Sequence, residues 1–470
     1  MVGKLPDSSA DNANVLKRQH GLFVSTCFVV GFIVGTGIFF LPGRILYEVG
    51  GDVWLGALAW IIGGLMIAPT VFMFSVFAGM YEKVHGFVDY SEVIVGKRFG
   101  YLAGWFFAVM YQPAGYAIIA WITSGFTATV IGMSPGDEVY LPFRFFISSF
   151  YMAMTFVMNY LAPKIPVKFN VATTVARMVP LVLMGMVGGL VGIFVRGGDV
   201  QAVGTSIHMS DASFFSAISA TAFAFNGWQA SLAFNSEIKD SKRKFPIAIM
   251  LGFFAVAVVY VLYFIGIGTA SPGRIGVMIE GGGENFAHGT RLIFSDVFGG
   301  TAGNLLTVFM IVSGLGILNA CCLGMSRAMY SLGRRGRGPM PRRMATLNAG
   351  TNVPNFSMVL AVGISFLWLL VIFVNSRTGV GFSLPDFYNF NFFALLVPIF
   401  LCFIIKAKDV HPVKRFVFPS LAVTGAGFMF ASYWLGSVFH GVMYSGVFVV
   451  LAIVGMVFYR RGVQSELYNQ

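Results

Sequence analysis

The residues Gly35-Thr36-Gly37-Ile38-Phe39-Phe40-Leu41-Pro42-Gly43 interrupt a stretch, 21–47, that is otherwise apolar enough to cross a membrane. Glycine in a helix interior costs about 1 kcal/mol relative to alanine, so two glycines around a threonine favour an unwound segment. Backbone N–H and C=O groups that are freed inside a membrane are tolerated where they line a cavity. The motif therefore predicts a helix that is broken near mid-membrane.

A second interruption has the same character. Phe223-Ala224-Phe225-Asn226-Gly227-Trp228-Gln229 places an amide and a glycine in the middle of the apolar stretch 213–237. Small residues in membrane helices also serve close helix packing. Two interrupted stretches at the heads of two halves of a chain are instead typical of a transporter binding site. We therefore predict two five-helix repeats, over segments one to five and six to ten.

The overall composition is that of a membrane protein. Of the 470 residues, 57% are apolar and only 11% are charged, and the mean hydropathy is +0.79. A soluble domain carries about 25% charged residues, and disordered chains are poor in aromatic residues, so both classes are excluded. A spanning helix needs about 20 mostly apolar residues. Twelve segments qualify: 21–47, 53–79, 99–132, 143–161, 168–195, 213–237, 246–270, 300–332, 355–375, 384–405, 413–436 and 439–459.

The net charge of +12 is spread unevenly along the chain. With twelve spans and a cytoplasmic N-terminus, 24 of the 31 Lys and Arg fall in cytoplasmic segments, six fall outside and Arg177 falls within a span. Positive residues gather on the cytoplasmic side, so both termini are expected there. The expected plan is an all-α polytopic protein of the cell membrane, with a tail over 1–20, a first repeat over 21–196, a second repeat over 213–406, two extra helices over 412–460 and a tail over 461–470.

Two connectors differ from the spans. Residues 80–98 mix charged and apolar side chains, and we expect an amphipathic cytoplasmic connector. Residues 271–299 contain three consecutive glycines and are too polar to span, so we expect a long extracellular loop with room for a short helix near 291–297. All the cysteines fall in apolar segments and are interpreted as small buried hydrophobic residues: Cys27, Cys321, Cys322 and Cys402.

The two breaks suit a zwitterion. N–H groups at the start of the outer half of segment one, with the positive end of that helix dipole, favour a carboxylate. Unpaired carbonyl groups at the end of the first half of segment six favour an ammonium group. An α-amino acid carries one of each and needs no full protein charge beside it.

Three motifs carry a resemblance that covers essentially the whole chain. Residues 35–39 resemble the first-helix signature of the amino acid–polyamine–organocation (APC) superfamily. Residues 223–229, followed by 237–246, are similar to the sixth helix and following loop of its L-type amino acid transporter branch. Ser326-Arg327-Ala-Met-Tyr330, with Gly336-Arg-Gly-Pro339 and Val353-Pro354, is similar to the end of the eighth helix and its loop. The resemblance implies an amino acid transporter with a LeuT-like fold, in which two inverted five-helix repeats are followed by two extra helices.

The resemblance also implies a binding site on the unwound backbone. The substrate carboxylate would bind N–H groups of Thr36, Gly37 and Ile38, and the amine would bind carbonyls of Ile33, Phe223, Ala224 and Phe225. Phe223 would double as an aromatic gate, and the side-chain pocket would include Asn226, Trp228 and Gln229. The family often has Asp or Gly in place of Asn226, whose alternative role is to satisfy the unwound backbone.

Arg177 places a full charge within segment five, about nine residues or 13 Å from its cytoplasmic end. From the residues alone, snorkelling to the interface and a functional role are equally open. Many members of the family carry a Lys here, which resembles a substitute for the sodium ion between helices one and eight of sodium-coupled relatives. Arg177 keeps that cation but stays protonated, and its planar guanidinium is not equivalent to an ammonium. We therefore expect sodium-independent transport, with exchange favoured over proton symport.

Other groups within the spans have two interpretations each. Asn319 either lines the pocket or pairs two helices, and Phe392 is either a second aromatic lid or part of the core. Tyr116, with Gln112 and Pro113, either faces the pocket or relieves a kink. Glu237, at the end of segment six, is interpreted as the gate-closing partner of a basic group near Arg327.

Other classes of protein find little support in the sequence. The six histidines form no HExxH pair, and the glycine run lacks the Lys-Ser/Thr of a phosphate loop. The spans show no continuous polar lining for a channel. We expect no enzyme, no metal, no cofactor and no nucleic acid; the expected partners are the lipid bilayer and a small-molecule amino acid.

The predicted pocket holds no acidic residue, which favours neutral amino acids. The alternatives are an antiporter of cationic amino acids or amines and a proton-coupled symporter. The resemblance implies that eukaryotic relatives form a heavy-chain disulfide in their second extracellular loop. The corresponding loop here, 133–142, contains no cysteine, so no disulfide-linked heavy chain is expected.

Overall fold

The computed structural model describes residues 21–80, 86–161, 178–195, 213–232, 238, 240–283, 285–348 and 353–460. These ranges are almost entirely helical. Ten helices within them are long and apolar enough to cross a membrane, and one bent pair of helices is a further candidate. The prediction of an all-α polytopic membrane protein is confirmed, whereas the count of twelve spans and the inverted repeats stay predictions.

The helices of the first half follow the predicted segments closely. They are α1 (Leu22–Ile33), α2 (Gly37–Glu48), α3 (Val53–Met80), α4 (Phe87–Ile94), α5 (Lys97–Phe106), the π-helical turn η1 (Phe107–Tyr111), α6 (Gln112–Val130), α7 (Tyr140–Leu161) and the span Met178–Val195, which includes the π-helical turns η2 (Met184–Gly188) and η3 (Val191–Val195). The turn η1 comes just before Pro113, whose ring removes a backbone donor from the helix.

The second half is also nearly continuous helix. It contains α9 (Phe214–Phe225), α10 (Trp228–Ser231), α11 (Ser241–Ala270), the 3₁₀ turn η5 (Pro272–Arg274), α12 (Ile275–Gly283), α13 (Phe286–Phe298), α14 (Gly300–Arg334), α15 (Pro341–Met344), α16 (Asn355–Thr378), α17 (Leu384–Lys406), the π-helical turn η6 (Val413–Val417), α18 (Phe418–Gly436) and α19 (Val438–Arg460). Side chains of Ser213 and Ser383 cap α9 and α17 by accepting hydrogen bonds from backbone N–H groups, which satisfies donors that a helix start leaves unpaired.

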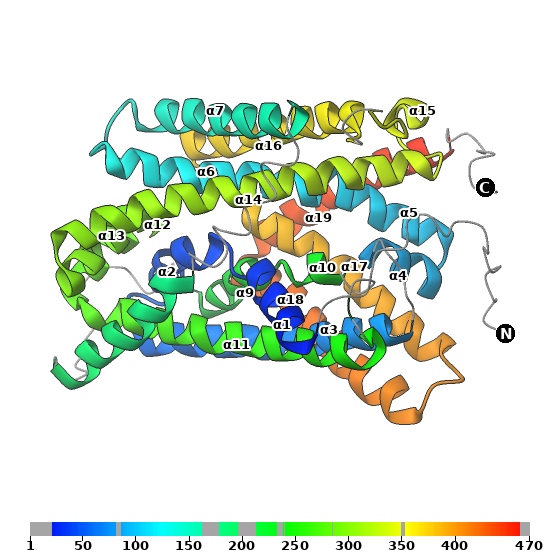
Figure 1. Cartoon of the computed structure of the whole chain (residues 1–470), viewed down its shortest axis with the longest axis horizontal. Helices are drawn as coiled ribbons and strands as arrows, with labels where there is room; N and C mark the ends of the chain where they lie inside the picture. The colour runs from blue at the N-terminus through cyan, green and yellow to red at the C-terminus, as the bar shows by residue number, and fades with distance from the viewer. Residues whose placement is uncertain are drawn as a thin grey trace.

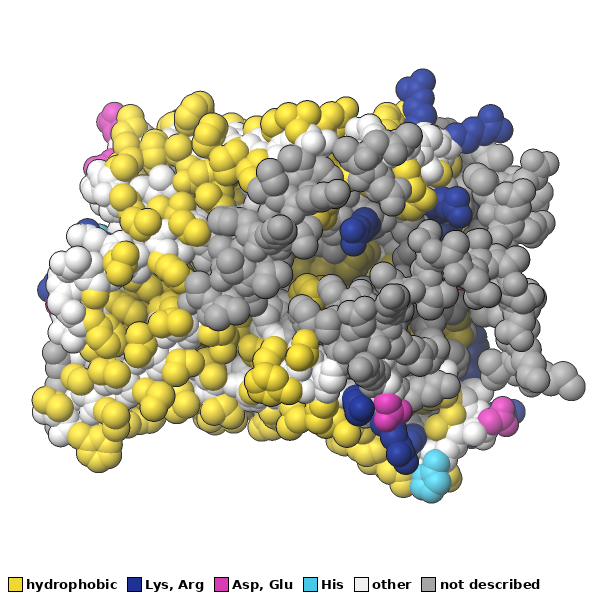
Figure 2. Space-filling model, in the orientation of Figure 1, with side chains coloured by type: hydrophobic (Ala, Val, Ile, Leu, Met, Phe, Trp, Pro, Cys, Tyr) yellow, Lys and Arg dark blue, Asp and Glu magenta, His cyan; other side chains and the backbone are white. Residues whose placement is uncertain are grey.

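The broken segments lie at the centre of the molecule. Helices α1, α2, α9 and α10 lie between the long helices α11 and α14 (Figure 1). Helix α1 packs against α11, and α2 packs against α9. Helices α12 and α13 lie at one end of the bundle and α4 and α15 at the other (Figure 1). Figure 2 shows a largely hydrophobic outer surface, on which most of the visible Lys and Arg side chains lie towards the α15 end.

The predicted loop over 271–299 and the predicted burial of all four cysteines are each wrong in part. The stretch 271–299, expected as a long loop, is mostly the helices α12 and α13, because Phe286, Ile293 and Phe294 recur at helical spacing and bury in the core. The short helix expected near 291–297 is part of α13. Cys322 is buried as expected, but Cys27 is exposed on the outer surface of α1, since an apolar helix in a membrane faces lipid as well as protein.

The connector 80–98 contains α4, which is fixed to the end of α14 by ion pairs. The Arg335 guanidinium lies 2.6 Å from a carboxylate oxygen of Glu92 and also bonds to Asp89. All three side chains are at most 21% exposed. Charged residues from two distant parts of the chain thus hold this end of the bundle together.

Candidate functional site

The first predicted break is present in the structure. Helix α1 ends at Ile33 and α2 begins at Gly37, and the two axes differ in direction by 51°. Val34 has extended backbone angles. The first N–H groups of a helix have no intrahelical acceptor, so those of Thr36, Gly37 and Ile38 lie where α2 can offer donors to an anion.

The second predicted break is also present. Helix α9 ends at Phe225 and α10 begins at Trp228, with Asn226 in extended conformation between them. Gly227 has φ +107°, and a Cβ there would lie 2.1 Å from the carbonyl oxygen of Phe32. Only glycine adopts this conformation without strain, and the absence of a side chain lets the second break touch the end of α1.

The two breaks face each other. A Cβ added to Gly37 would lie 3.1 Å from the Cα of Ala224 and 3.2 Å from Cδ1 of Phe223. Segments that are about 190 residues apart in the chain therefore bring N–H groups of α2 beside the carbonyl end of α9. This is the arrangement of opposite backbone charges that the zwitterion hypothesis requires.

Tyr260 of α11 joins the breaks, and sequence reasoning missed it. Its hydroxyl lies 3.2 Å from the carbonyl oxygen of Ile33 and 3.3 Å from that of Ala224, and its side chain is fully buried. Both carbonyls were predicted to receive the substrate amine. A tyrosine in an apolar 30-residue helix carries no local signal of such a contact, because the contact depends on where α11 packs.

A chain of amides connects the second break to α17. The N–H of Gly227 donates to Oε1 of Gln229 at 2.8 Å, and Nε2 of Gln229 donates to Oδ1 of Asn226 at 3.1 Å. Asn226 in turn donates to Asn389. Gln229 thus accepts the hydrogen bond from the unwound backbone, a role that the sequence had suggested for Asn226. Asn226 instead links the break to Asn389, which the sequence did not single out.

An aromatic layer lies beside the breaks. The Phe223 ring contacts Phe40 and Tyr388, with centroids 5.7 and 5.5 Å apart, and Tyr388 stacks on Tyr111 at 4.0 Å. Phe392 lies 5.3 Å from Tyr111, so it joins this layer while 97% of its surface is buried. We call Phe40, Phe223, Tyr388, Tyr111 and Phe392 the aromatic layer.

The remaining predicted side chains lie in different surroundings. Trp228 is buried against Phe74 of α3, with centroids 5.1 Å apart. The hydroxyl of Tyr116 donates to the carbonyl of Met152 in α7 at 2.7 Å. Oδ1 of Asn319 accepts a hydrogen bond from Asn159 of α7 at 3.1 Å, so Asn319 pairs two helices. Arg177 and Glu237 lie outside the described residues.

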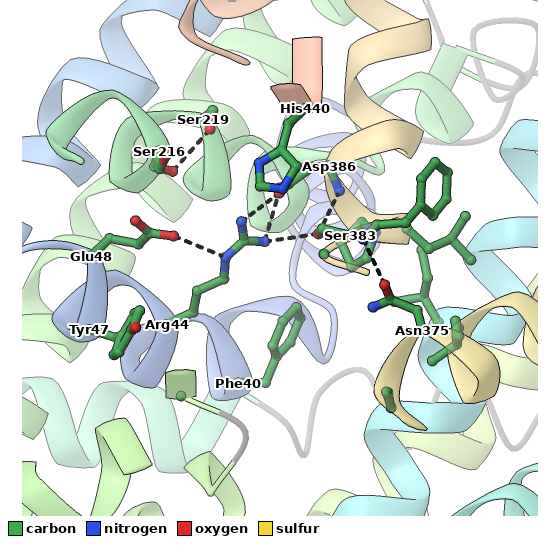
Figure 3. A pocket seen from close by; sticks show the side chains of 18 of the residues that line it. Phe40, Arg44, Tyr47, Glu48, Ser216, Ser219, Asn375, Ser383, Asp386 and His440 are labelled. Carbon is green, nitrogen blue, oxygen red and sulfur yellow. Dashed lines mark hydrogen bonds and ion pairs between the residues drawn. The ribbon is translucent and has the colours of Figure 1, made fainter. Parts of the chain in front are cut away.

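A cavity of about 550 Å³ adjoins the aromatic layer and shares Phe40 with it. It lies towards the α12 and α13 end and is lined by polar groups from α2, α9, α16, α17 and α19, among them Ser216, Asn375, Ser383 and His440 (Figure 3). Arg144 of α7 also lines it, with its guanidinium stacked 4.1 Å over the Trp121 ring. A cavity of this size, with polar groups set among apolar ones, accommodates a small molecule.

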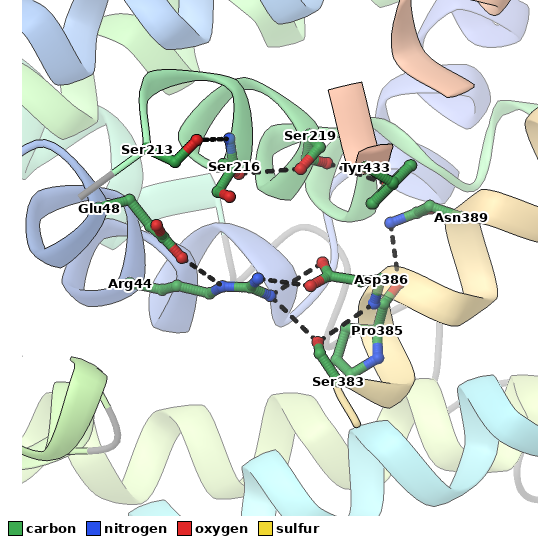
Figure 4. A network of polar contacts seen from close by, with 10 residues as sticks. All are labelled: Arg44, Glu48, Ser213, Ser216, Ser219, Ser383, Pro385, Asp386, Asn389 and Tyr433. Atoms are coloured by element: carbon green, nitrogen blue, oxygen red, sulfur yellow. Dashed lines mark hydrogen bonds and ion pairs between the residues drawn. The ribbon is translucent and has the colours of Figure 1, made fainter. Parts of the chain in front are cut away.

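An ion pair crosses this cavity. Arg44 of α2 donates to both carboxylate oxygens of Asp386 in α17, once at 2.9 Å, and to the hydroxyl of Ser383 at 3.3 Å (Figure 4). Glu48 lies 3.9 Å from the same guanidinium. The Arg44 and Asp386 side chains are 21% and 10% exposed, so the pair is mostly withdrawn from solvent. Bidentate charge-assisted bonds of this kind are strong and directional, and they tie the outer half of the first broken segment to α17.

Comparisons with known proteins match nearly the whole chain. A family model described as amino acid permease matches residues 21–460. The serine/threonine exchanger SteT of Bacillus subtilis is 25% identical over 95% of this chain and 97% of its own length. The b(0,+)-type amino acid transporter 1 of Mus musculus is 23% identical over 85% of this chain and 79% of its own. The large neutral amino acids transporter small subunit 2 of Oryctolagus cuniculus is 22% identical over 97% of this chain and 83% of its own.

Proposed function

This chain belongs to the amino acid permease family of the APC superfamily, and we propose that it exchanges neutral L-amino acids across the cell membrane, independently of sodium, by alternating access. The coarser statement, that it is a multi-pass membrane protein of an amino acid transporter family and not an enzyme, follows from the family. The observation that carries the finer proposal is the contact between Gly37 and Ala224, where the two breaks meet.

The substrate carboxylate binds the N–H groups of Thr36, Gly37 and Ile38. These three donors stand at the start of α2, whose dipole places partial positive charge there. No protein side chain is needed to neutralise the carboxylate, which leaves the pocket neutral overall. The same backbone then serves every α-amino acid, whatever its side chain.

The substrate ammonium group binds the carbonyl ends of α1 and α9, at Ile33, Phe223, Ala224 and Phe225. The Tyr260 hydroxyl already approaches two of these carbonyls. A carbonyl oxygen has two lone pairs and accepts a second donor. Tyr260 therefore positions the carbonyls for the ammonium and keeps the two broken segments in register.

The aromatic layer and the Arg44–Asp386 pair together close the outer path. Phe40 lines the cavity and contacts Phe223 beside the breaks, and the ion pair holds α2 against α17 on the cavity side. In this proposal the α12 and α13 end faces the outside, and a substrate that enters there passes only after both contacts open. Asn226 and Asn389 link α17 to the second break, so movement of α17 and occupation of the site are coupled.

The substrate class and the coupling rest on separate grounds. The hydrogen bonds of Asn226 and Gln229 and the ring contacts of Tyr388 are with neutral groups, which favours a neutral side chain because burying an unpaired charge is costly. Two of the similar proteins are named for serine and threonine or for large neutral amino acids. Arg177 supplies the cation that replaces sodium, and because an arginine stays protonated, exchange is favoured over proton symport.

The test uses purified protein in proteoliposomes. Vesicles loaded with one unlabelled neutral amino acid should take up the same labelled amino acid much faster than empty vesicles, with or without sodium. Gly37→Val adds bulk where even a single added Cβ would lie 3.1 Å from the Cα of Ala224 in α9, so it should abolish the exchange. A panel of all common amino acids then identifies the substrates by competition.

Each alternative has its own outcome in this assay. Inhibition by arginine, lysine or agmatine alone would support the cationic antiporter instead. Uptake into empty vesicles that depends on a proton gradient would support a symporter, and a strong sodium requirement would contradict the role given to Arg177.

A further inference from the structure

Tyr111 is a buried tyrosine of the aromatic layer whose hydroxyl the proposed transport cycle does not use. It ends the π-helical turn η1, directly before Gln112. Single π-helical turns within α-helices are frequent at functional sites. The Tyr111 side chain is only 7% exposed and stacks on Tyr388 with ring centroids 4.0 Å apart. Its ring is therefore held in place beside the two breaks.

The hydroxyl of Tyr111 points to a ligand. It is buried and makes no hydrogen bond within the described ranges. The polar groups of Gln229 and Tyr388 lie close to it, but neither has the geometry of a hydrogen bond with it. Buried polar groups in proteins are nearly always hydrogen-bonded, so an exception calls for a specific explanation. The simplest explanation is that a group on the substrate, bound at the adjoining breaks, makes this hydrogen bond.

Gln229 adds a second polar group at the same place. Its amide is held by the N–H of Gly227 and by Oδ1 of Asn226, at 2.8 and 3.1 Å. An amide nitrogen carries two hydrogens, and these contacts use one of them. The other is available to an acceptor on the substrate. A phenol hydroxyl and an amide N–H thus form a small neutral patch, and the patch suits a hydroxyl or carboxamide better than a charged group.

The aromatic layer limits the length of the side chain that reaches this patch. A Cβ added to Gly115 would lie 3.3 Å from Cε2 of Tyr388. The Phe223 ring contacts Tyr388 as well, with centroids 5.5 Å apart. Tyr388 therefore has little room to withdraw from Tyr111, because dense packing resists such shifts. A short side chain fits beside the stacked pair with less rearrangement than an aromatic one.

We propose that Tyr111 is a specificity-determining residue, whose hydroxyl, together with the Gln229 amide, selects amino acids with a short neutral side chain bearing a hydroxyl or carboxamide group. The proposal rests on the proposed function, since the backbone at the breaks must hold the carboxylate and ammonium groups first. A site that hydrogen-bonds a substrate group rejects the isostere that lacks it, because its own polar atoms are then left unpaired.

Threonine and valine are the pair of substrates that tests this, because they have nearly the same shape and differ by a hydroxyl and a methyl group. The measurement is the concentration of each that half-inhibits homoexchange of one labelled amino acid in proteoliposomes. The unmodified protein should prefer threonine by about tenfold, the scale of one hydrogen bond. Tyr111→Phe keeps the stacked ring and should reduce the preference to within about threefold, chiefly by weakening threonine.

Tyr263→Phe is the matched control. It also removes a buried hydroxyl without a hydrogen bond in the described ranges, but its ring packs on Phe39 of α2, with centroids 5.7 Å apart. This variant should keep the full preference for threonine. The Tm of each variant should equal or exceed the Tm of the unmodified protein. A changed threonine-to-valine ratio would then not result from misfolding.

The two levels of the proposal fail in different ways. If the unmodified protein exchanges no amino acid, the proposed function is wrong. If it exchanges amino acids but does not distinguish threonine from valine, or if Tyr111→Phe leaves the ratio unchanged, transport stands and the role given to Tyr111 is overturned.

Discussion

The phenol oxygen of Tyr260 lies 3.2 Å from the carbonyl oxygen of Ile33, the last residue of α1. The same hydroxyl lies 3.3 Å from the carbonyl oxygen of Ala224, one residue before the end of α9. One hydroxyl hydrogen is thus shared between the carbonyl ends of the two broken segments. Helix α11, which is continuous over 30 residues, therefore serves as the fixed support against which both breaks are held.

Tyr260→Phe should destabilise the empty protein more than the substrate-bound one. The change leaves two buried carbonyls with one donor fewer, at a cost of about 1–3 kcal/mol. A substrate ammonium supplies the missing donor, so saturating amino acid should raise the Tm of the variant by more than it raises the Tm of the unmodified protein. Thermal unfolding in detergent, with and without substrate, measures both increments. Equal increments would argue against these carbonyls as the ammonium site.

Asp386→Asn should open the outer cavity. Breaking a mostly buried ion pair by removing one partner costs about 3–5 kcal/mol, because the remaining charge is left without compensation. A cysteine introduced at Ser216, which lines the cavity, should react with a membrane-impermeant thiol reagent at least about tenfold faster when combined with Asp386→Asn.

Asp296→Asn is the control for this experiment. Asp296 pairs with Arg274 at a more exposed position, where the side chains are 28% and 43% accessible, and exposed pairs contribute about 0–1 kcal/mol. Its removal should leave the labelling rate unchanged. Equal rates with and without Asp386→Asn would show that the Arg44–Asp386 pair does not close the cavity.

Gly227→Ala should abolish transport. The residue has φ +107°, and the new Cβ would lie 2.1 Å from the Phe32 carbonyl oxygen, so both the backbone angle and the contact between the breaks are lost. Gly363→Ala in α16 is the matched control, because a Cβ there meets nothing within 4 Å; it should be neutral or slightly stabilising. Exchange assays on the two variants measure the difference, and full activity of Gly227→Ala would contradict the close contact of the breaks.

Arg335→Ala should destabilise the end of the bundle that contains α4. The guanidinium joins Asp89 and Glu92 of α4 to the end of α14, with all three side chains at most 21% exposed. Loss of a pair at this burial costs about 3 kcal/mol. The neighbouring Arg334→Ala, at an exposed position, should change the Tm little. Limited proteolysis near residue 86 provides a second readout, and an unchanged cleavage rate in Arg335→Ala would show that these ion pairs do not hold α4 in place.

Much of the fold was predictable because its signals are local. Apolar runs of about 20 residues mark membrane helices wherever they occur in the chain. The breaks at Gly35-Thr36-Gly37 and Asn226-Gly227 were predictable for the same reason, since the cost of a glycine in a helix depends on the residue itself. Helix α12 and the first part of α13 were missed because their polar residues mask an apolar face that becomes evident only when it packs on the core.

By itself, therefore, the sequence determined that the chain is an all-α membrane protein and where two of its segments unwind. The tertiary structure decided which side chains meet at those breaks. Tyr260, Asn389 and the Arg44–Asp386 pair carry no local pattern, and the last of these joins residues 342 positions apart. The side chains of Tyr116 and Asn319, predicted near the substrate pocket, make hydrogen bonds to α7. The physical reason is that the free energy of unwinding is set by the backbone of a few neighbouring residues, whereas the partner of a buried polar group is set by how helices that are distant in sequence pack together.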